Sequence, residues 1–140
     1  MELSQALSFV GDRTRSVLVT ERGSDGHPQL SNVMHHLGED GVVRVSITSS
    51  RAKYKNLLRT PWAALHITSD DFWSWVVVEG EVSLAPVAQA PDDDTVEELV
   101  AYYRALSGEH DDWDAYRASM VAEGRTVVRL RPGRAYGQLP

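Results

Sequence analysis

The stretch WSWVVVEGEVSL, residues 73–84, decides the fold of this chain. It is rich in β-branched residues, which fit the pleated surface of a strand. Because side chains alternate between the two faces of a strand, the apolar residues at even positions from Val76 to Leu84 share one face. Gly80 lies in phase with them, and a glycine there indicates a β-bulge or a close backbone approach. The sequence therefore predicts a long strand over 73–84 with one apolar face.

Five shorter segments on either side of this stretch also have the composition of strands. Between them, RGSDGHP at 22–28 and GEDG at 38–41 predict tight turns. Tight turns join antiparallel strands, because parallel neighbours need a connection of a dozen residues or more. The predicted strands are 16–20, 29–37, 42–48, 63–68, 73–84 and 125–131. Six antiparallel strands with few edges to spare predict a closed or nearly closed β-barrel with helices packed outside it.

Four helices are predicted around this sheet, so the fold class is mainly β with peripheral helices. Residues 2–10 have apolar side chains at helical spacing. A second helix over 52–59 can be capped by Ser49 or Ser50 and ends before Pro61. The third begins in Asp94-Thr-Val-Glu97, which has the spacing of a capping box with Asp94 as the cap. The fourth starts at Asp111 or Asp112 and stops at Gly124.

Size and composition predict one ordinary globular domain over residues 1–140. The chain is 42% hydrophobic and 24% charged, in the normal range for proteins that bury a single core. Cysteine is absent, which excludes thiol catalysis and disulfides and fits a reducing compartment. The N-terminus is acidic and amphipathic, unlike a signal peptide, and no apolar run is long enough for a membrane span. We therefore expect a cytoplasmic protein that does not associate with membranes.

The net charge of −6 is unevenly distributed. Residues 92–114 hold nine acidic residues against Arg104 alone, whereas RAKYKNLLR at 51–59 holds four basic residues and no acidic one. Duplex nucleic acid requires an extended basic face, so no nucleic-acid partner is expected. One or two phosphates need only a few donors, which makes a small anionic ligand the better candidate. Charge alone, however, favours the plainer interpretation that these basic residues form a solvated helix face.

The basic segment also has the residue types of an anion site. Ser50, Arg51, Lys53 and Asn56 occupy a strand end and the first turns of the predicted helix. The free N–H groups at a helix start attract an anion. Arg51 can hold a phosphate through two parallel hydrogen bonds, and Lys53 adds a compact point charge. This segment is the first candidate for ligand binding.

A second candidate is the polar strand PQLSNV at 28–33. Amide and hydroxyl side chains on a strand usually face solvent, and otherwise they suit a flat ring with polar edges. Trp73 and Trp75, expected on one face of the 73–84 strand, can stack on such a ring. Aromatic packing under a second subunit or a helix explains the two tryptophans equally well.

The sequence has no recognisable motif for a metal site or for an activated serine. His35 and His36 are adjacent in a predicted strand and point to opposite faces, so they cannot chelate one metal together. The sequence has no His-x-His or His-Glu-x-x-His spacing and no Gly-x-Ser-x-Gly elbow. We therefore expect no metal site and no activated serine, and no residue is nominated as catalytic.

Taken together, these segments resemble the flavin and deazaflavin oxidoreductases with a split β-barrel, the superfamily named after pyridoxamine 5′-phosphate oxidase. The actinobacterial branch that uses the deazaflavin coenzyme F420 is the most similar. Each segment alone is weak evidence for the family, whereas the order and spacing of all of them together are specific to it. The segments that carry the resemblance are 25–33, 50–57, 73–75, 78–80, 90–96, 108–110, 112–117 and 136–137. The resemblance implies a six-stranded antiparallel split β-barrel of the FMN-binding type, where FMN is flavin mononucleotide.

The resemblance also implies a function and a site. A homodimer would hold F420 in a groove between its subunits and transfer a hydride between the reduced deazaflavin and an unsaturated small molecule. The phosphate would be held by Arg51, Lys53 and Asn56, beside Ser50. The deazaflavin ring would be lined by Gln29, Ser31, Asn32 and Val33, with Ser46 and Ile47 on the neighbouring strand. Trp73 and Trp75 would come from the partner subunit.

Two alternatives stay open from the sequence. FMN-dependent oxidases of the pyridoxamine-phosphate type share the implied fold, and no residue excludes FMN as the cofactor. The second alternative is a protein that carries or sequesters F420 and has no substrate pocket. In the enzymes of this kind the bound cofactor carries the redox chemistry while the protein orients it.

Overall fold

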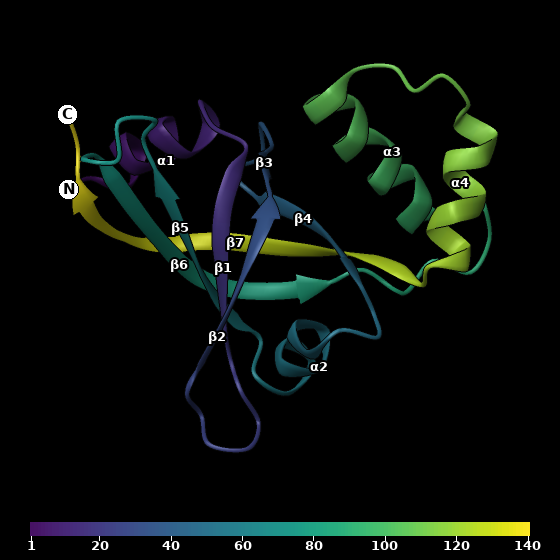
Figure 1. Ribbon diagram of the computed structural model, residues 1–140, viewed down its shortest axis with the longest axis horizontal. Coiled ribbons are helices and arrows are strands. Elements are labelled where there is room, and N and C mark those ends of the chain that lie inside the picture. The colour runs from purple at the N-terminus through teal and green to yellow at the C-terminus, as the bar shows by residue number, and fades with distance from the viewer.

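One antiparallel sheet organises residues 1–140 in the computed structural model (Figure 1). The sheet follows the order β2-β1-β5-β6-β7-β4-β3 and curls so that the edge strand β2 comes near β4 without pairing with it. The result is a split barrel, mainly β with helices around it, as the sequence predicts. The strands are β1 Arg15–Glu21, β2 Pro28–Met34, β3 His36–Leu37, β4 Val43–Thr48, β5 Trp62–Thr68, β6 Trp75–Leu84 and β7 Arg125–Gln138.

The prediction of six strands is wrong by one, because the segment 29–37 forms two strands. β2 pairs with β1 and β3 pairs with β4, and His35 lies between them. The backbone N–H of His35 donates to the carbonyl of Thr14 (2.8 Å). Its fully buried ring bonds to Ser16 Oγ (2.7 Å) and to the carbonyl oxygen of Val10 (3.0 Å). These bonds to the interior end the β1–β2 ladder and direct the chain toward its pairing with β4.

The environment of His35 makes the stability of the fold depend on pH. A carbonyl only accepts hydrogen bonds, so Nε2 carries the proton toward Val10 and Nδ1 accepts from the Ser16 hydroxyl. Burial is the main cause that lowers the pKa of His35 from its ordinary value. As the pH falls below about 6.5, the unfolded chain binds a proton that the folded chain rejects.

We therefore expect the free energy of unfolding to decrease on acidification by up to about 1.4 kcal/mol per pH unit. Urea unfolding at pH 7.5 and pH 5.5 measures this decrease in the wild type and in His35→Gln. The decrease should be smaller in His35→Gln and unchanged in His27→Gln, because the side chain of His27 is 69% exposed. The same decrease in His35→Gln as in the wild type would contradict the prediction.

The four helices lie where the sequence predicts them, but two of their caps differ. Asp93, not Asp94, caps α3: its carboxylate accepts from the backbone N–H of Val96 (2.8 Å). Asp93 also accepts from two N–H groups of the preceding loop, which a residue inside the helix cannot reach. Arg51, rather than a serine before it, is the N-cap residue of α2. The helices are α1 Leu3–Gly11, α2 Ala52–Arg59, α3 Asp94–Ser107 and α4 Trp113–Ala122.

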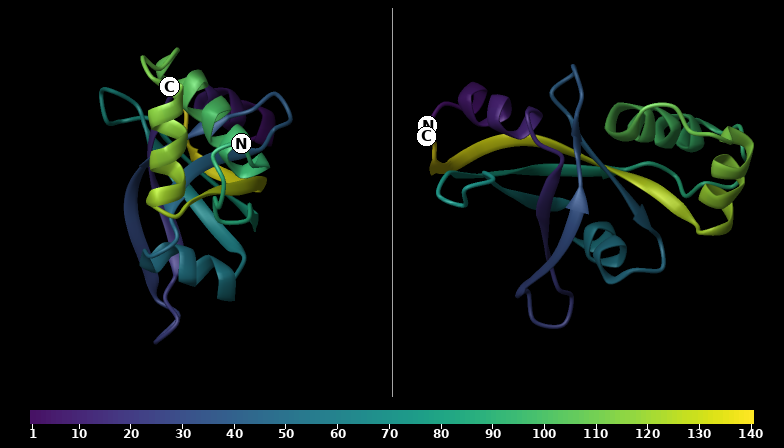
Figure 2. Two further views of the ribbon diagram at one scale, coloured as in Figure 1. Left: turned by 90° about the vertical axis from the view of Figure 1, so that its right-hand side faces the viewer. Right: turned by 45° about the horizontal axis from the view of Figure 1, so that its top comes forward.

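The two faces of the sheet are covered differently. The main core lies on the inner face, where α1 and α2 pack against side chains such as Leu65 and Val78. On the outer face, α3 and α4 form a second cluster with Val127 of β7. Figure 2 shows α3 and α4 at one end of the long strands β6 and β7, and α1 near the other end. The outer face of β2, β1 and β5 has no helix over it and exposes Leu30 and Met34.

The last strand is longer than predicted, because a bulge carries it past Pro132. β7 reaches Gln138 instead of ending at 131, and the β6–β7 register shifts between Glu79 and Gly80. The predicted close approach at Gly80 is confirmed, since a Cβ there would lie 2.1 Å from the carbonyl oxygen of Arg131. The bulge accommodates a proline, which has no N–H to offer the ladder.

Candidate functional site

A groove runs along the gap between the edge strand β2 and strand β4 and consists of two adjoining hollows. Both hollows share Ser46, Lys53 and Arg125. We call the first the cation pocket; its lining is Ser46, Ile47, Thr48, Arg51, Lys53 and Arg125. We call the second the tyrosine pocket; its lining is Asn32, Val33, Met34, Ser46, Lys53, Tyr102, Tyr103, Tyr116, Met120 and Arg125.

The cation pocket concentrates positive charge at the start of α2. Arg51, Lys53 and Arg125 face one hollow, and the only carboxylate paired with them is Glu123, 3.0 Å from Arg125. Burial lowers the pKa of the Lys53 ammonium, and the Arg51 and Arg125 cations lower it further. Cations that repel one another in a partly buried hollow are stabilised by a bound anion. The pocket is therefore suited to a phosphate or another oxyanion.

The structure brings four of the predicted site residues together in this pocket, namely Ser46, Ile47, Arg51 and Lys53. It adds Arg125, which the sequence analysis missed. Arg125 reaches the pocket because β4 pairs with β7 in a register that places Thr48 opposite it. No local spacing links these residues, so only knowledge of the strand pairing identifies Arg125 as a member of the site.

Two residues predicted to hold the phosphate lie outside the groove lining. Asn56 is 6% exposed, and its Nδ2 donates to Thr20 Oγ1 (3.1 Å) while its Oδ1 accepts from Arg59 (3.3 Å). These bonds anchor α2 to β1, so the amide of Asn56 serves the fold. Ser50 lies in the exposed turn before α2 and lines neither pocket.

The predicted ring residues of β2 divide between the two faces of that strand. Asn32 and Val33 line the tyrosine pocket. Ser31 faces α2, where its hydroxyl accepts from Lys53 Nζ at 3.4 Å, so it touches the groove through that ammonium. Gln29 accepts from Thr20 Oγ1 (2.9 Å) and lies outside both pockets. The groove at the edge of β2 thus takes residues from both faces of the strand, and only part of the polar segment lines it.

Only one of the two tryptophans belongs to strand β6. β6 begins at Trp75, and Trp73 lies in the preceding turn, where the carboxylate of Asp71 accepts from its backbone N–H (3.2 Å). The expectation that both share one face of a strand is therefore wrong, because the turn requires a positive φ of 78° at Phe72. Trp73 and Trp75 instead line a hollow with Phe72 and Gln138, outside the groove of the same chain.

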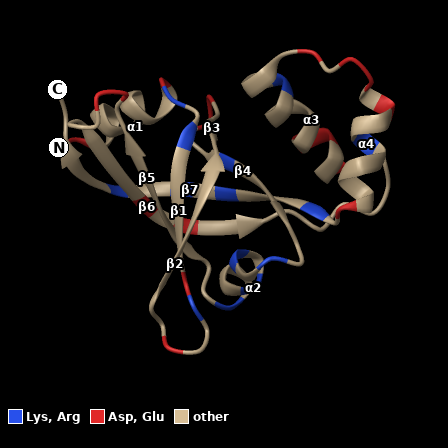
Figure 3. Ribbon diagram, in the orientation of Figure 1, with Lys and Arg blue, Asp and Glu red and all other residues tan.

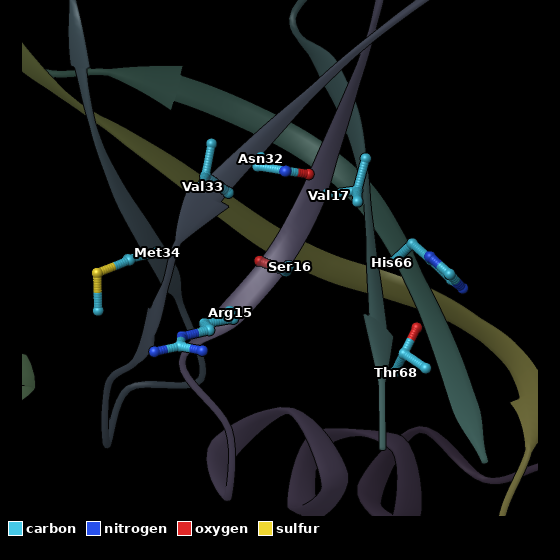
Figure 4. Close-up of a pocket in the computed structure, with 8 residues that line it drawn as sticks. All are labelled: Arg15, Ser16, Val17, Asn32, Val33, Met34, His66 and Thr68. Atoms are coloured by element: carbon cyan, nitrogen blue, oxygen red, sulfur yellow. The ribbon is translucent and has the colours of Figure 1, made fainter. Parts of the chain in front are cut away.

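Beside the groove, the uncovered outer face carries a further hollow of about 510 Å³ (Figure 4). Asn32, Val17 and His66 lie side by side across β2, β1 and β5, as their register requires. Asn32, Val33 and Met34 line this hollow and also the tyrosine pocket. The edge strand β2 is therefore the wall that separates the groove from the open face of the sheet.

The opposite wall of the tyrosine pocket comes from α3 and α4. Tyr103 and Tyr116 belong to an aromatic cluster with His110 and Trp113, whose ring centroids lie 5.0 to 5.7 Å apart. Burial raises the pKa of Tyr116 to about 12, so its hydroxyl is protonated and donates to the carbonyl of Leu99 (2.9 Å). None of these rings is among the residues that the sequence predicts for the site.

Charge differs between α2 and the connection between α3 and α4. Figure 3 shows Lys and Arg gathered on α2 and the loop before it, and Asp and Glu along the connection between α3 and α4.

No group of three or more His, Asp or Glu side chains is arranged to hold a metal ion. None of the helices is both long enough and apolar enough to cross a membrane.

The antiparallel sheet, its open gap and the groove along that gap define the class of split-barrel proteins. Within this class, the family model described as pyridoxamine 5′-phosphate oxidase matches residues 4–139. The chain therefore belongs to the pyridoxamine 5′-phosphate oxidase family.

Solved structures of several proteins are similar to this chain over nearly its whole length. An F420 reductase is 23% identical, with a TM-score of 0.69 over 92% of this chain and 94% of its own. A conserved hypothetical protein from Mycobacterium tuberculosis is 20% identical, with a TM-score of 0.75 over 100% of this chain and 89% of its own. A heme storage protein from Vibrio cholerae is 16% identical, with a TM-score of 0.70 over 99% of this chain and 96% of its own. Likeness at these identities establishes the fold.

Proposed function

We propose that this chain is an oxidoreductase that binds the deazaflavin coenzyme F420 and transfers a hydride between the reduced coenzyme and an unsaturated small molecule. The observation that carries the proposal is the cation pocket, where Arg51, Lys53 and Arg125 meet beside a groove with polar and aromatic walls. F420 joins a phosphate to a flat ring, and the two adjoining hollows suit these two parts. The similar fold of an F420 reductase supports the choice of coenzyme.

Each residue of the cation pocket has a distinct role in this proposal. The planar guanidinium of Arg51 presents two parallel donors to the phosphate oxygens, and Arg125 presents a second fork from β7. Lys53, which lines both hollows, adds a point charge between the phosphate and the ring. Ser46 offers a hydroxyl beside Arg125 (3.5 Å). Together they bind the anionic end and fix the direction in which the ring lies.

The ring end of the groove is suited to orientation. Asn32 offers an amide to the polar edge of a ring, while Val33 and the tyrosines of α3 and α4 provide flat apolar contact. The bound coenzyme supplies the hydride chemistry. The residues that line the two hollows would bind the coenzyme and orient it, and no carboxylate is among them.

A direct test titrates F420 and FMN separately into the protein at one ionic strength, because salt weakens ionic contacts. Tighter binding of F420, followed by loss of the reduced spectrum when unsaturated acceptors are added, supports the proposal. Tighter binding of FMN with consumption of oxygen favours an FMN-dependent oxidase, whose phosphate suits the same pocket. Binding of F420 with no oxidation by any acceptor favours a carrier protein.

We also propose that the chain is a homodimer whose partner supplies Trp73 and Trp75 to the groove. The uncovered outer face and its rim expose large apolar side chains, and such a patch marks an interaction surface. A two-fold dimer buries the same patch of both copies at once. The side chains, between 45% and 71% exposed, are Leu30, Met34, Phe72, Trp73 and Tyr136.

We expect Leu30→Lys to weaken the dimer at least about tenfold, because a charge would be buried in an apolar interface. Light scattering measures the effect as a change from the mass of two 15.6 kDa chains toward that of one. Leu58→Lys is the matched control, since Leu58 on α2 is 60% exposed and Leu30 is 59% exposed. A wild-type mass of a single chain at micromolar concentration would refute the dimer.

A further inference from the structure

One face of α3 is bonded to both sides of the gap in the barrel. Glu98 and Tyr102 are one helical turn apart, so their side chains lie on the same face. The carboxylate of Glu98, 16% exposed, accepts from Arg44 of β4 (2.9 Å) and from Arg129 of β7 (3.0 Å). The hydroxyl of Tyr102 donates to the carbonyl of Met34, the last residue of β2, at 2.8 Å. The helix thus spans the gap that the sheet leaves open.

The bond from Tyr102 reaches the edge of β2 that no strand pairs with. The ladder between β1 and β2 ends with the pair Arg15 and Met34, and no strand pairs with the other edge of β2. An unpaired backbone carbonyl at a strand edge needs a donor from elsewhere. Burial raises the pKa of the Tyr102 phenol, so the hydroxyl stays protonated and available as that donor.

The gap that Tyr102 spans is also the groove. Tyr102 lines the tyrosine pocket together with Met34 of β2 and Ser46 of β4. The separation of these two strands is therefore the width of the ligand groove. We propose that Tyr102 is a positioning residue: its hydroxyl holds the end of β2 at a fixed distance from β4 and so keeps the groove at the width its ligand requires. The link to a ligand rests on the proposed function, whereas the link to strand separation does not.

The test compares Tyr102→Phe with Tyr116→Phe in the full chain. Both substitutions keep the ring and remove one hydroxyl that donates to a backbone carbonyl. The Tyr116 hydroxyl bonds to Leu99 within the helical pair and does not reach across the gap. The loss of one tyrosine hydroxyl therefore lowers stability in both variants, whereas the loss of a bond to β2 occurs only in Tyr102→Phe.

Hydrogen exchange of the protein without ligand measures the strand end directly. We expect the peptide covering 30–36 to exchange about three- to tenfold faster in Tyr102→Phe than in the wild type, because one net hydrogen bond no longer opposes local opening. In Tyr116→Phe the same peptide should exchange at the wild-type rate. Unchanged exchange in Tyr102→Phe, or equal acceleration in both variants, overturns the proposal.

Titration with F420 and FMN measures the consequence for the groove. We expect Tyr102→Phe to raise the dissociation constant of the coenzyme about three- to tenfold and to shift the absorption maximum of the bound ring. Wild-type affinity and spectrum in Tyr102→Phe overturn the positioning role even if exchange accelerates. If the wild type binds neither coenzyme, the proposed function fails, and the exchange result alone then decides whether Tyr102 holds the strands.

Discussion

Lys53→Ala should raise the dissociation constant of F420 by about tenfold to a hundredfold. A hydrogen bond to a charged group contributes about 1.5–3 kcal/mol, and this range corresponds to that loss of affinity. Lys53 lines both the cation pocket and the tyrosine pocket, so under the proposed function its ammonium would face the place where the phosphate joins the rest of the coenzyme. The fold should stay intact, because its one side-chain bond, to Ser31, is a long 3.4 Å. Titration by fluorescence at one stated salt concentration measures the change.

Lys55→Ala is the matched control for this prediction. Lys55 is exposed on the same helix and lines neither pocket, so its removal should change the affinity much less. Arg51→Lys should also weaken binding, since an ammonium cannot reproduce the two parallel bonds of a guanidinium. Equal weakening by Lys53→Ala and Lys55→Ala would indicate a diffuse basic surface, and no weakening by Lys53→Ala or Arg51→Lys would remove the segment from the site.

Gly80→Ala should destabilise the fold by about 3 kcal/mol, the upper part of the range for overpacked sites. A Cβ at this position would lie 2.1 Å from the carbonyl oxygen of Arg131 and 3.1 Å from the backbone nitrogen of Gly133. Both contacts are to backbone, so no flexible side chain can move aside, and β6 and β7 must separate at their bulge. Urea or thermal unfolding followed by circular dichroism measures the loss.

Gly133→Ala provides the control on the other strand of the same bulge. A Cβ there has no heavy atom within 4 Å, so it meets open space. The stability should therefore change by only a few tenths of a kcal/mol, as is usual for a substitution at an exposed position. A Gly80→Ala variant as stable as Gly133→Ala would show that the two strands yield at this point without cost.

Much of the fold follows from short-range patterns in the chain. The apolar alternation at 73–84 and the turn residues at 22–28 and 38–41 predict an antiparallel sheet, and the structure has one. The helices are also found where spacing and stop signals place them. These features are predictable because neighbouring residues determine the preferred backbone conformation and the face that each side chain occupies.

The errors arose where particular hydrogen bonds compete with the spacing pattern. His35 has an ordinary strand neighbourhood, yet its bonds to Val10 and Ser16 divide one predicted strand into two. Trp73 is in phase with Trp75, yet it lies in a turn. The capping box at Asp94 has the right spacing, but Asp93 reaches more free N–H groups and takes its place. In each case hydrogen bonds outside the local pattern determine the outcome.

The candidate site also divides into residues that local patterns identify and residues that only the tertiary structure identifies. By itself, the sequence determined the basic segment with Arg51 and Lys53, because residue type and helix start are local properties. Only the tertiary structure added Arg125 and Tyr102, which the β4–β7 register and the packing of α3 carry to the groove. It also assigned Asn56 to the anchoring of α2. Register and packing join residues far apart in the chain, and no periodicity records which of them meet.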